Sequence, residues 1–171
     1  DEGNAASITT SNGEGSSYLI PGTDIAINNM LGEADLNPLG FHNWPCDRRI
    51  SSMMSPTLVL RRGEPEFVLG SGGSNRIRTA ILQVILNLID LKLPLETAIE
   101  NPRVHWEDRI LNIEPPFSTE DTDTLQLLDA TEVILWKAKS MFFGGVHGVG
   151  RTAGRVVGAG DPRREGAVAI A

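Results

Sequence analysis

A glycine-rich turn between a strand and a long apolar helix constrains the fold of this chain more than any other feature. The turn reads GSGGSNR over residues 70–76. Apolar residues then recur at helical spacing between Arg76 and Leu91; they are Ile77, Ile81, Val84, Ile85, Leu88 and Ile89. Leu82 and Leu86 widen the apolar stripe, so we expect the helix to be buried on most of its sides. A helix of this kind requires packed layers around it.

Strand-like segments lie before and after this helix along the chain. The predicted strands are Ala5–Thr10, Tyr18–Ile20, Ile25–Asn29, Thr57–Arg61, Glu66–Leu69, Ile110–Ile113, Val133–Trp136, Phe142–Gly150 and Val156–Gly158, with Ala167–Ala171 as a further candidate. Two more helices are predicted, at Leu95–Glu100 and Thr119–Ala130. Because strands are followed by helices and then by strands, we expect an α+β fold with helices packed on a sheet. The length of 171 residues indicates one domain.

Charge and composition exclude several classes of function. The chain carries 15 Lys and Arg against 22 Asp and Glu, a net charge of -7. This balance argues against a nucleic-acid partner or an anionic membrane surface, because both select for clustered cations. No apolar run reaches the roughly 18 residues that a membrane-spanning helix needs. With one cysteine, Cys46, and scattered His42, His105 and His147, we expect neither a metal nor a cofactor.

The first residues resemble the middle of a strand rather than the N-terminus of a protein. We therefore expect a chain cut from a longer precursor, in which a targeting segment could precede Asp1. The sequence for this reason assigns no compartment.

The turn at residues 70–76 has two interpretations. Backbone N–H groups at a helix start lack intrahelical partners and lie at the positive end of the helix dipole, where they stabilise a carboxylate, a phosphate or a developing oxyanion. The turn is not a phosphate-binding P-loop, because no Gly-Lys-Ser/Thr follows, and Asn75 replaces the third glycine of a dinucleotide fingerprint. The alternative is a plain tight turn in which Ser74 or Asn75 caps the helix.

Two further groups of polar residues are candidates for binding. Residues 51–56, SSMMSP, place three hydroxyls just before a strand, where they bind a substrate carboxylate or cap the loop backbone. Asn12, Glu14 and Glu33 lie in loops that could converge, although a loop carboxylate is ordinarily just solvated. No Gly-x-Ser-x-Gly motif is present, so a hydrolase triad of that type lacks its nucleophile.

Taken together and in order, six segments resemble the small subunit of the gamma-glutamyltranspeptidase family. They are GNAASITTSN (3–12), PGTDIAINNMLGE (21–33), RRISSMMSPTLVL (48–60), GSGGSNRIRTAILQVILNLID (70–90), IENPRVH (99–105) and GAGDPRREGA (158–167). The resemblance covers nearly the whole chain. Its most specific parts are the Ser-Ser-Met-x-Ser-Pro-Thr run and the glycine-rich turn into the apolar helix.

The resemblance implies a fold and an activity. The family belongs to the N-terminal-nucleophile hydrolases, whose fold is a four-layer αββα sandwich. A precursor cleaves itself, and the new N-terminal threonine of the small subunit attacks a γ-glutamyl amide such as that of glutathione. Its α-amine acts as the base, and water, an amino acid or a peptide takes the acyl group. The threonine would lie upstream of Asp1, so the chain alone would be inactive and would need the large subunit of the same precursor as its partner.

The resemblance also implies roles for individual residues. Ser11 matches a threonine whose hydroxyl contacts the nucleophile. Asn12 and Glu33 match residues that hold the α-ammonium group of the γ-glutamyl donor. Ser51 and Ser52 match the pair that binds its α-carboxylate, together with an arginine of the large subunit.

Gly73 and Ser74 match the two glycines whose backbone N–H groups form the oxyanion hole. Serine departs from glycine at position 74, yet any residue except proline keeps the N–H donor. Met30 stands where many members have a glutamine that touches the α-amino group. The stretch from Glu33 to Arg49 is shorter than the lid of the well-known members, which leaves the acceptor undefined.

Two alternatives to a gamma-glutamyltranspeptidase-like enzyme remain open at this point. One is another amidase of the same fold, such as a β-lactam side-chain acylase, which Met30 would suit. The other is a non-catalytic member that binds small amino compounds or has a structural role. The residue at the processed N-terminus distinguishes the second from an enzyme.

Overall fold

The computed structural model of the protein describes residues 3–118, 120 and 132–169, and the chain divides into two compact units. We call Asp1–Ile8 with Met54–Ala171 the sheet unit, and Thr9–Met53 the loop unit. Strands and helices occur together, so the fold is mixed α/β.

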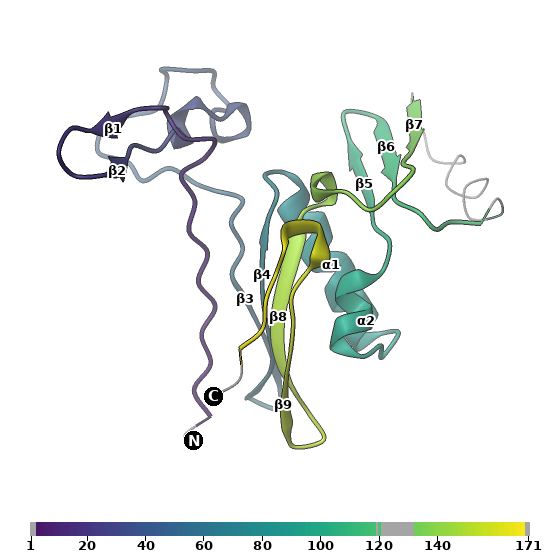
Figure 1. The fold of residues 1–171 in the computed structure, drawn as a ribbon. Helices are drawn as coiled ribbons and strands as arrows, with labels where there is room; N and C mark the ends of the chain where they lie inside the picture. The colour runs from purple at the N-terminus through teal and green to yellow at the C-terminus, as the bar shows by residue number, and fades with distance from the viewer. Residues whose placement is uncertain (1–2, 119, 121–131, 170–171) are drawn as a thin grey trace. The chain divides into compact units, whose positions relative to one another are not determined.

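The centre of the sheet unit is an antiparallel sheet with the strand order β3-β4-β8-β9 (Figure 1). Its strands are β3 (Thr57–Arg61), β4 (Glu64–Gly72), β8 (Gly145–Thr152) and β9 (Arg155–Ala159). Arg62 and Gly63 join β3 to β4 with φ angles of 54° and 88°. Positive φ angles at both residues are typical of a two-residue hairpin turn, because they match the twist of the flanking strands. Val68 lies opposite Leu58 on one side and Val149 on the other, which fixes the register of three strands.

Helices α1 (Arg76–Ile89) and α2 (Leu95–Glu100) cover one face of this sheet (Figure 1). The buried side of α1 consists of Ile77, Ala80, Ile81, Val84 and Leu88. Leu82, Leu86 and Ile89 are exposed, so burial on most sides is wrong for the helix in this chain. In the described part of the chain the main sheet covers one side of α1, and a sheet on one side of a helix buries one stripe of it.

A smaller sheet follows α2 and has the strand order β5-β6-β7. It comprises β5 (Val104–Glu107), β6 (Ile110–Ile113) and β7 (Glu132–Leu135), with β6 and β7 parallel. The short elements are β1 (Leu19–Ile20), β2 (Ile25–Ala26) and the 3-10 turns η1 (Met30–Gly32), η2 (Ala34–Leu36), η3 (Met141–Phe143) and η4 (Pro162–Arg164).

Several predicted elements differ from the structure. Ala5–Thr10 is wrong as a strand, because the structure shows no ladder along this segment; Ser7 Oγ donates a hydrogen bond to Leu69 O of β4 at 2.8 Å. Strand β4 continues through Gly72, further than predicted. Residues 167–169 form no strand, and the predicted helix Thr119–Ala130 lies outside the described residues. Strand β5 was not predicted.

Four charged side chains lie together in the core of the sheet unit. Asp161 and Glu114 are both 0% exposed. Arg103 Nη2 lies 2.7 Å from Asp161 Oδ2, and Arg163 donates to both carboxylates. Burial alone would raise the pKa of Asp161, but the two arginines outweigh it and hold that pKa below its usual value. Two carboxylates and two guanidinium groups thus balance in charge where an unpaired charge would be costly.

Candidate functional site

In the loop unit, the segment that carries Ser11 and Asn12 is fixed by hydrogen bonds. Ser11 Oγ accepts the N–H of Gly13 at 3.0 Å. The carbonyl of Asn12 accepts the N–H groups of Gly15 at 3.1 Å and Asn29 at 2.8 Å. The segment is therefore a defined turn held against Asn29, while the side chain of Asn12 stays exposed at its surface.

The Glu33 carboxylate lies over this turn. A Cβ atom at Gly13 would approach Glu33 Oε1 to 2.8 Å, so the carboxylate lies close to this residue, and the φ of 62° at Gly13 favours glycine. Burial raises the pKa of Glu33, and the neighbouring carboxylates of Asp35 and Glu14 raise it further. A partly buried carboxylate in a negative environment is stabilised by a cation, so this corner suits an ammonium group.

The remaining predicted residues of the loop unit are less tightly placed. Met30 begins η1, and its carbonyl accepts the N–H of Glu33 at 3.2 Å, so the backbones of the two residues lie side by side. Ser51 and Ser52 are exposed and make no hydrogen bond to any residue that the structure describes. The structure thus brings together Ser11, Asn12, Met30 and Glu33, and it does not join the serine pair to them by a hydrogen bond.

In the sheet unit, Gly73 and Ser74 form the turn between β4 and α1. Their φ angles are 135° and 51°, both in the left-handed region. The carbonyl of Gly73 accepts the N–H of Arg76, and that of Ser74 accepts the N–H of Ile77, each at 3.0 Å. Among the described residues, the Gly73 N–H has no hydrogen-bond acceptor. Asn75 occupies the N-cap position of α1, as the plain-turn interpretation predicts, but its side chain makes no capping hydrogen bond.

Glycine at position 73 is also required by the close approach of another segment. A Cβ atom at Gly73 would lie 2.7 Å from Gly144 Cα, directly before β8. Gly144 itself has a φ of 75°. The two backbones can touch only because neither residue carries a side chain. The turn is therefore held in place by the segment before β8.

Strand β5 holds the start of α1 from the side, and sequence reasoning missed this contact. Glu107 accepts a hydrogen bond from Asn75 Nδ2 and lies 3.8 Å from Arg76 Nη1. His105 Nε2 lies 3.3 Å from Glu107 Oε2, and its Nδ1 lies 2.9 Å from Thr79 Oγ1. Burial lowers the pKa of His105, although Glu107 opposes the shift. Recognising β5 would have revealed the pair, because residues i and i+2 of a strand share a face.

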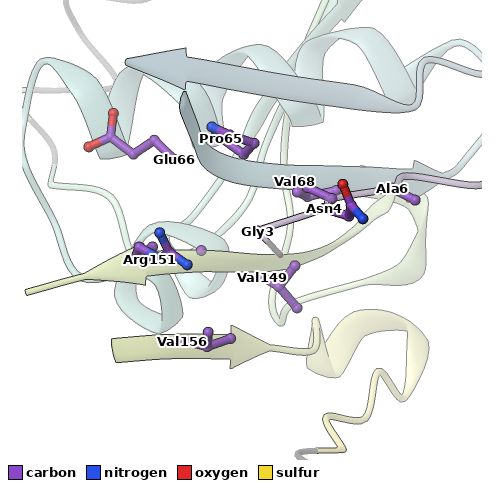
Figure 2. A pocket seen from close by; sticks show the side chains of 11 residues that line it. Gly3, Asn4, Ala6, Pro65, Glu66, Val68, Val149, Arg151 and Val156 are labelled. Carbon is purple, nitrogen blue, oxygen red and sulfur yellow. The ribbon is translucent and has the colours of Figure 1, made fainter. Parts of the chain in front are cut away.

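A groove of about 780 Å³ lies on the face of the main sheet opposite the helices (Figure 2). Its lining comprises Gly3, Asn4, Ala5, Ala6, Pro65, Glu66, Val68, Val149, Gly150, Arg151 and Val156. None of the predicted site residues lines it. The groove is therefore a feature of sheet packing rather than part of the candidate site.

The predicted site residues thus fall in both units, with Gly73 and Ser74 in the sheet unit and the others in the loop unit. Their roles and their convergence stay predictions. Among the described residues, no group of three or more His, Cys, Asp or Glu is arranged to hold a metal ion. No helix in the described part is long and apolar enough to cross a membrane.

Comparisons with known proteins match the whole chain. The family profile for gamma-glutamyltranspeptidase covers residues 1–171. The acylase ACY 1 proenzyme of Pseudomonas sp. (strain SE83) is 38% identical over 114 residues, 66% of this chain and 20% of that protein. The glutathione hydrolase proenzyme of Pseudomonas sp. (strain A14) is 31% identical over 199 residues, 99% of this chain and 33% of that protein.

A solved structure agrees with these matches. The gamma-glutamyltranspeptidase from Pseudomonas nitroreducens, complexed with L-DON, superposes with a TM-score of 0.79 at 26% identity. The superposition covers 99% of this chain and 95% of that chain. The chain spans a third or less of the length of the two curated relatives, at 33% and 20%. From the family profile, the relatives and the superposition together, the chain belongs to the gamma-glutamyltranspeptidase family.

Proposed function

We propose that this chain is the small-subunit part of an enzyme that cleaves γ-glutamyl amides, including glutathione, and transfers the acyl group to water, amino acids or peptides. The observation that carries the proposal is the Glu33 carboxylate, which lies close to Gly13 in the Asn12 turn. It provides an anion where the family resemblance requires one for the donor's ammonium group. Family membership supports the same reaction class.

The proposed reaction proceeds through an ester. The hydroxyl of a threonine upstream of this chain attacks the γ-carbonyl while its α-amine takes the proton, and the Ser11 hydroxyl orients it. Negative charge then moves to the carbonyl oxygen, where the N–H groups of Gly73 and Ser74 stabilise it. The C–N bond breaks, and the protonated α-amine gives its proton to the departing amine. Water or an acceptor amine then attacks the threonyl ester, which releases the threonine for another cycle.

The donor's α-amino acid group determines the proposed specificity. A γ-glutamyl group presents an ammonium and a carboxylate, so it needs an anion and a set of donors. Glu33 and Asn12 serve the ammonium, and the exposed Ser51 and Ser52 hydroxyls serve the carboxylate. Because the pKa of Glu33 is raised before a cation binds, an ammonium ion both gains an ion pair and keeps this carboxyl ionised.

We also propose that the main sheet forms one inner layer of a four-layer αββα sandwich. Helices cover one face, while Leu58, Val149 and Val156 on the other face are 49%, 45% and 64% exposed. Apolar side chains that share a strand face ordinarily pack against another layer. The groove on that face leaves room beside residues 3–6 for such a layer (Figure 2). A second sheet from the large subunit would complete the sandwich.

A related acylase is the second candidate function. The backbone of Met30 is hydrogen-bonded to that of Glu33. Many family members have a glutamine in place of Met30, so one polar contact to the α-amino group is missing. An acylase proenzyme is among the relatives of this chain. An apolar residue at this corner favours acyl groups that carry no α-ammonium.

Substrate competition in the full-length protein tests both proposals. The measurement is kcat/KM for a γ-glutamyl anilide, for the matched glutaryl anilide without the α-amino group, and for an aryl-acyl amide. We expect preference for the γ-glutamyl anilide and loss of all cleavage when the threonine at the processed terminus becomes alanine. Preference for the other two substrates would replace the first proposal by the acylase. No cleavage of any substrate would mean a non-catalytic member.

A further inference from the structure

The segment beneath the glycine turn is held by arginine side chains. Four successive backbone carbonyls, residues 141–144, each accept a hydrogen bond from an arginine. Arg164 Nη2 donates to the carbonyl of residue 141 at 3.3 Å, and Arg76 Nε donates to that of residue 142 at 3.2 Å. Arg103 Nη1 donates to the carbonyls of residues 143 and 144 at 3.2 and 3.4 Å. Three positive side chains therefore meet next to the turn between β4 and α1.

Arg164 comes closest to the turn itself. Its Nη1 lies 3.7 Å from the position of a Cβ at Gly72, and its Nη2 lies 3.7 Å from that of a Cβ at Gly73. A Cβ at Gly145 would collide with the Arg164 stem at 2.7 Å, so the glycine there leaves room for the side chain. The guanidinium group thus lies along the two glycines that precede Ser74.

The charges of the three arginines are balanced differently. Arg103 forms a buried ion pair with Asp161 at 2.7 Å, and Arg76 has Glu107 at 3.8 Å. Arg164 has no carboxylate within ion-pair distance among the residues that the structure describes, and its buried Nε makes no hydrogen bond. The positive charge of Arg164 is therefore not neutralised locally, and its field extends to Gly73.

We propose that Arg164 stabilises the negative charge that develops on the acyl oxygen at the Gly73–Ser74 turn. This inference rests on the proposed function, in which the two N–H groups bind that oxygen. A fixed cation beside the turn, in a partly buried site, strengthens such a turn without moving during the reaction. The guanidinium group does not touch the oxygen, so Arg164 acts through its field and through the position of residues 72–73.

The test uses the full-length protein with R164M, R164K and a matched control, R155M. Arg155 is exposed in β9, so R155M removes the same charge far from any contact with the turn that the structure describes. For each variant, kcat and KM for a γ-glutamyl anilide are measured per processed small chain. The affinity of a boronic acid analogue of the glutamyl group, which forms an anionic tetrahedral adduct, is measured beside that of glutamate.

We expect R164M to lower kcat by about 10–100-fold with little change in KM, while R164K restores most of it. The boronate affinity should fall with kcat, the glutamate affinity should stay, and R155M should match the wild type. A kcat of R164M equal to that of R155M would overturn the proposal. So would a loss confined to KM or to the yield of processed protein.

Folding failure and failure of the proposed function have distinct signatures. If R164M does not mature, R164K is compared with R164Q, since only lysine keeps the charge. Equal kcat values for these two, or failure of both to mature, would show a structural role and overturn the proposal. If the wild type cleaves only amides without an α-amino group, the proposed donor is wrong, and the arginine comparison is made on that substrate.

Discussion

Replacement of Asp161 by asparagine tests whether the buried charge network stabilises the sheet unit. D161N keeps the shape of the side chain but removes the charge that faces Arg103 at 2.7 Å and Arg163 at 3.2 Å. Glu114 is then left with two guanidinium groups. Removing one partner of a buried pair costs about 3–5 kcal/mol. For a folding unit of this size, that loss lowers the Tm by about 6–20 °C.

The pH dependence of the same variant gives a second measure. Because the pKa of Asp161 is held below its ordinary value of 3.8, its stabilising contribution is complete above that value. The contribution is lost as the pH falls through the lowered pKa of the folded state. The Tm difference between wild type and D161N should therefore be constant near neutral pH and shrink only below about pH 4.

A surface ion pair provides the control for D161N. Arg61 and Glu66 lie 2.8 Å apart, but the arginine side chain is 69% exposed. E66Q should cost no more than about 1 kcal/mol. Thermal unfolding of the full-length protein by scanning fluorimetry compares the two variants. If D161N lowers the Tm no more than E66Q does, the network does not stabilise the fold and the reasoning from burial is refuted.

Three further predictions concern the candidate site. S74P should reduce kcat by at least about 10²–10³-fold because it removes a backbone donor and cannot adopt the φ of 51° at this position, whereas S74A should be nearly neutral; equal losses would assign the effect to the side chain. E33Q should lower the ratio of kcat/KM for γ-glutamyl over glutaryl anilide by about 10–150-fold, which corresponds to the roughly 1.5–3 kcal/mol of a charged hydrogen bond, and an unchanged ratio would favour the acylase. Since the pKa of Glu33 is raised above 4.5, the wild-type KM for the γ-glutamyl donor should increase as the pH falls through that raised pKa; a KM of E33Q with the same pH profile would contradict the assignment.

Local signals in the sequence determined the elements that were predicted well. Strand β3, helix α2 and strand β6 have the predicted bounds, because turn residues such as Arg62-Gly63 and Asn101-Pro102 end them. The sequence also placed the start of α1 at Arg76, since its apolar periodicity begins there. Where turn residues and apolar periodicity indicate the same bounds, local sequence is enough to predict the element.

Elements that depend on distant partners were not predictable in this way. Ala5–Thr10 has strand composition, but a strand forms only where a neighbour pairs with its backbone, and no ladder forms along this segment. The contact between Gly73 and Gly144 joins residues 71 positions apart, so no local sequence pattern predicts it. The same holds for Arg164 beside Gly72. The candidate residues themselves came from family resemblance rather than from spacing.

The division into two units has a consequence for how the family diversifies. In our proposal, charge stabilisation belongs to the sheet unit, where Gly73 is locked against Gly144 and tolerates no side chain. Donor recognition belongs to Thr9–Met53, a loop-rich unit in which the side chains of Asn12, Ser51 and Ser52 are exposed. Substitutions can accumulate in the second without disturbing the first. New substrate preferences should therefore arise in residues 9–53, with the catalytic turn inherited intact.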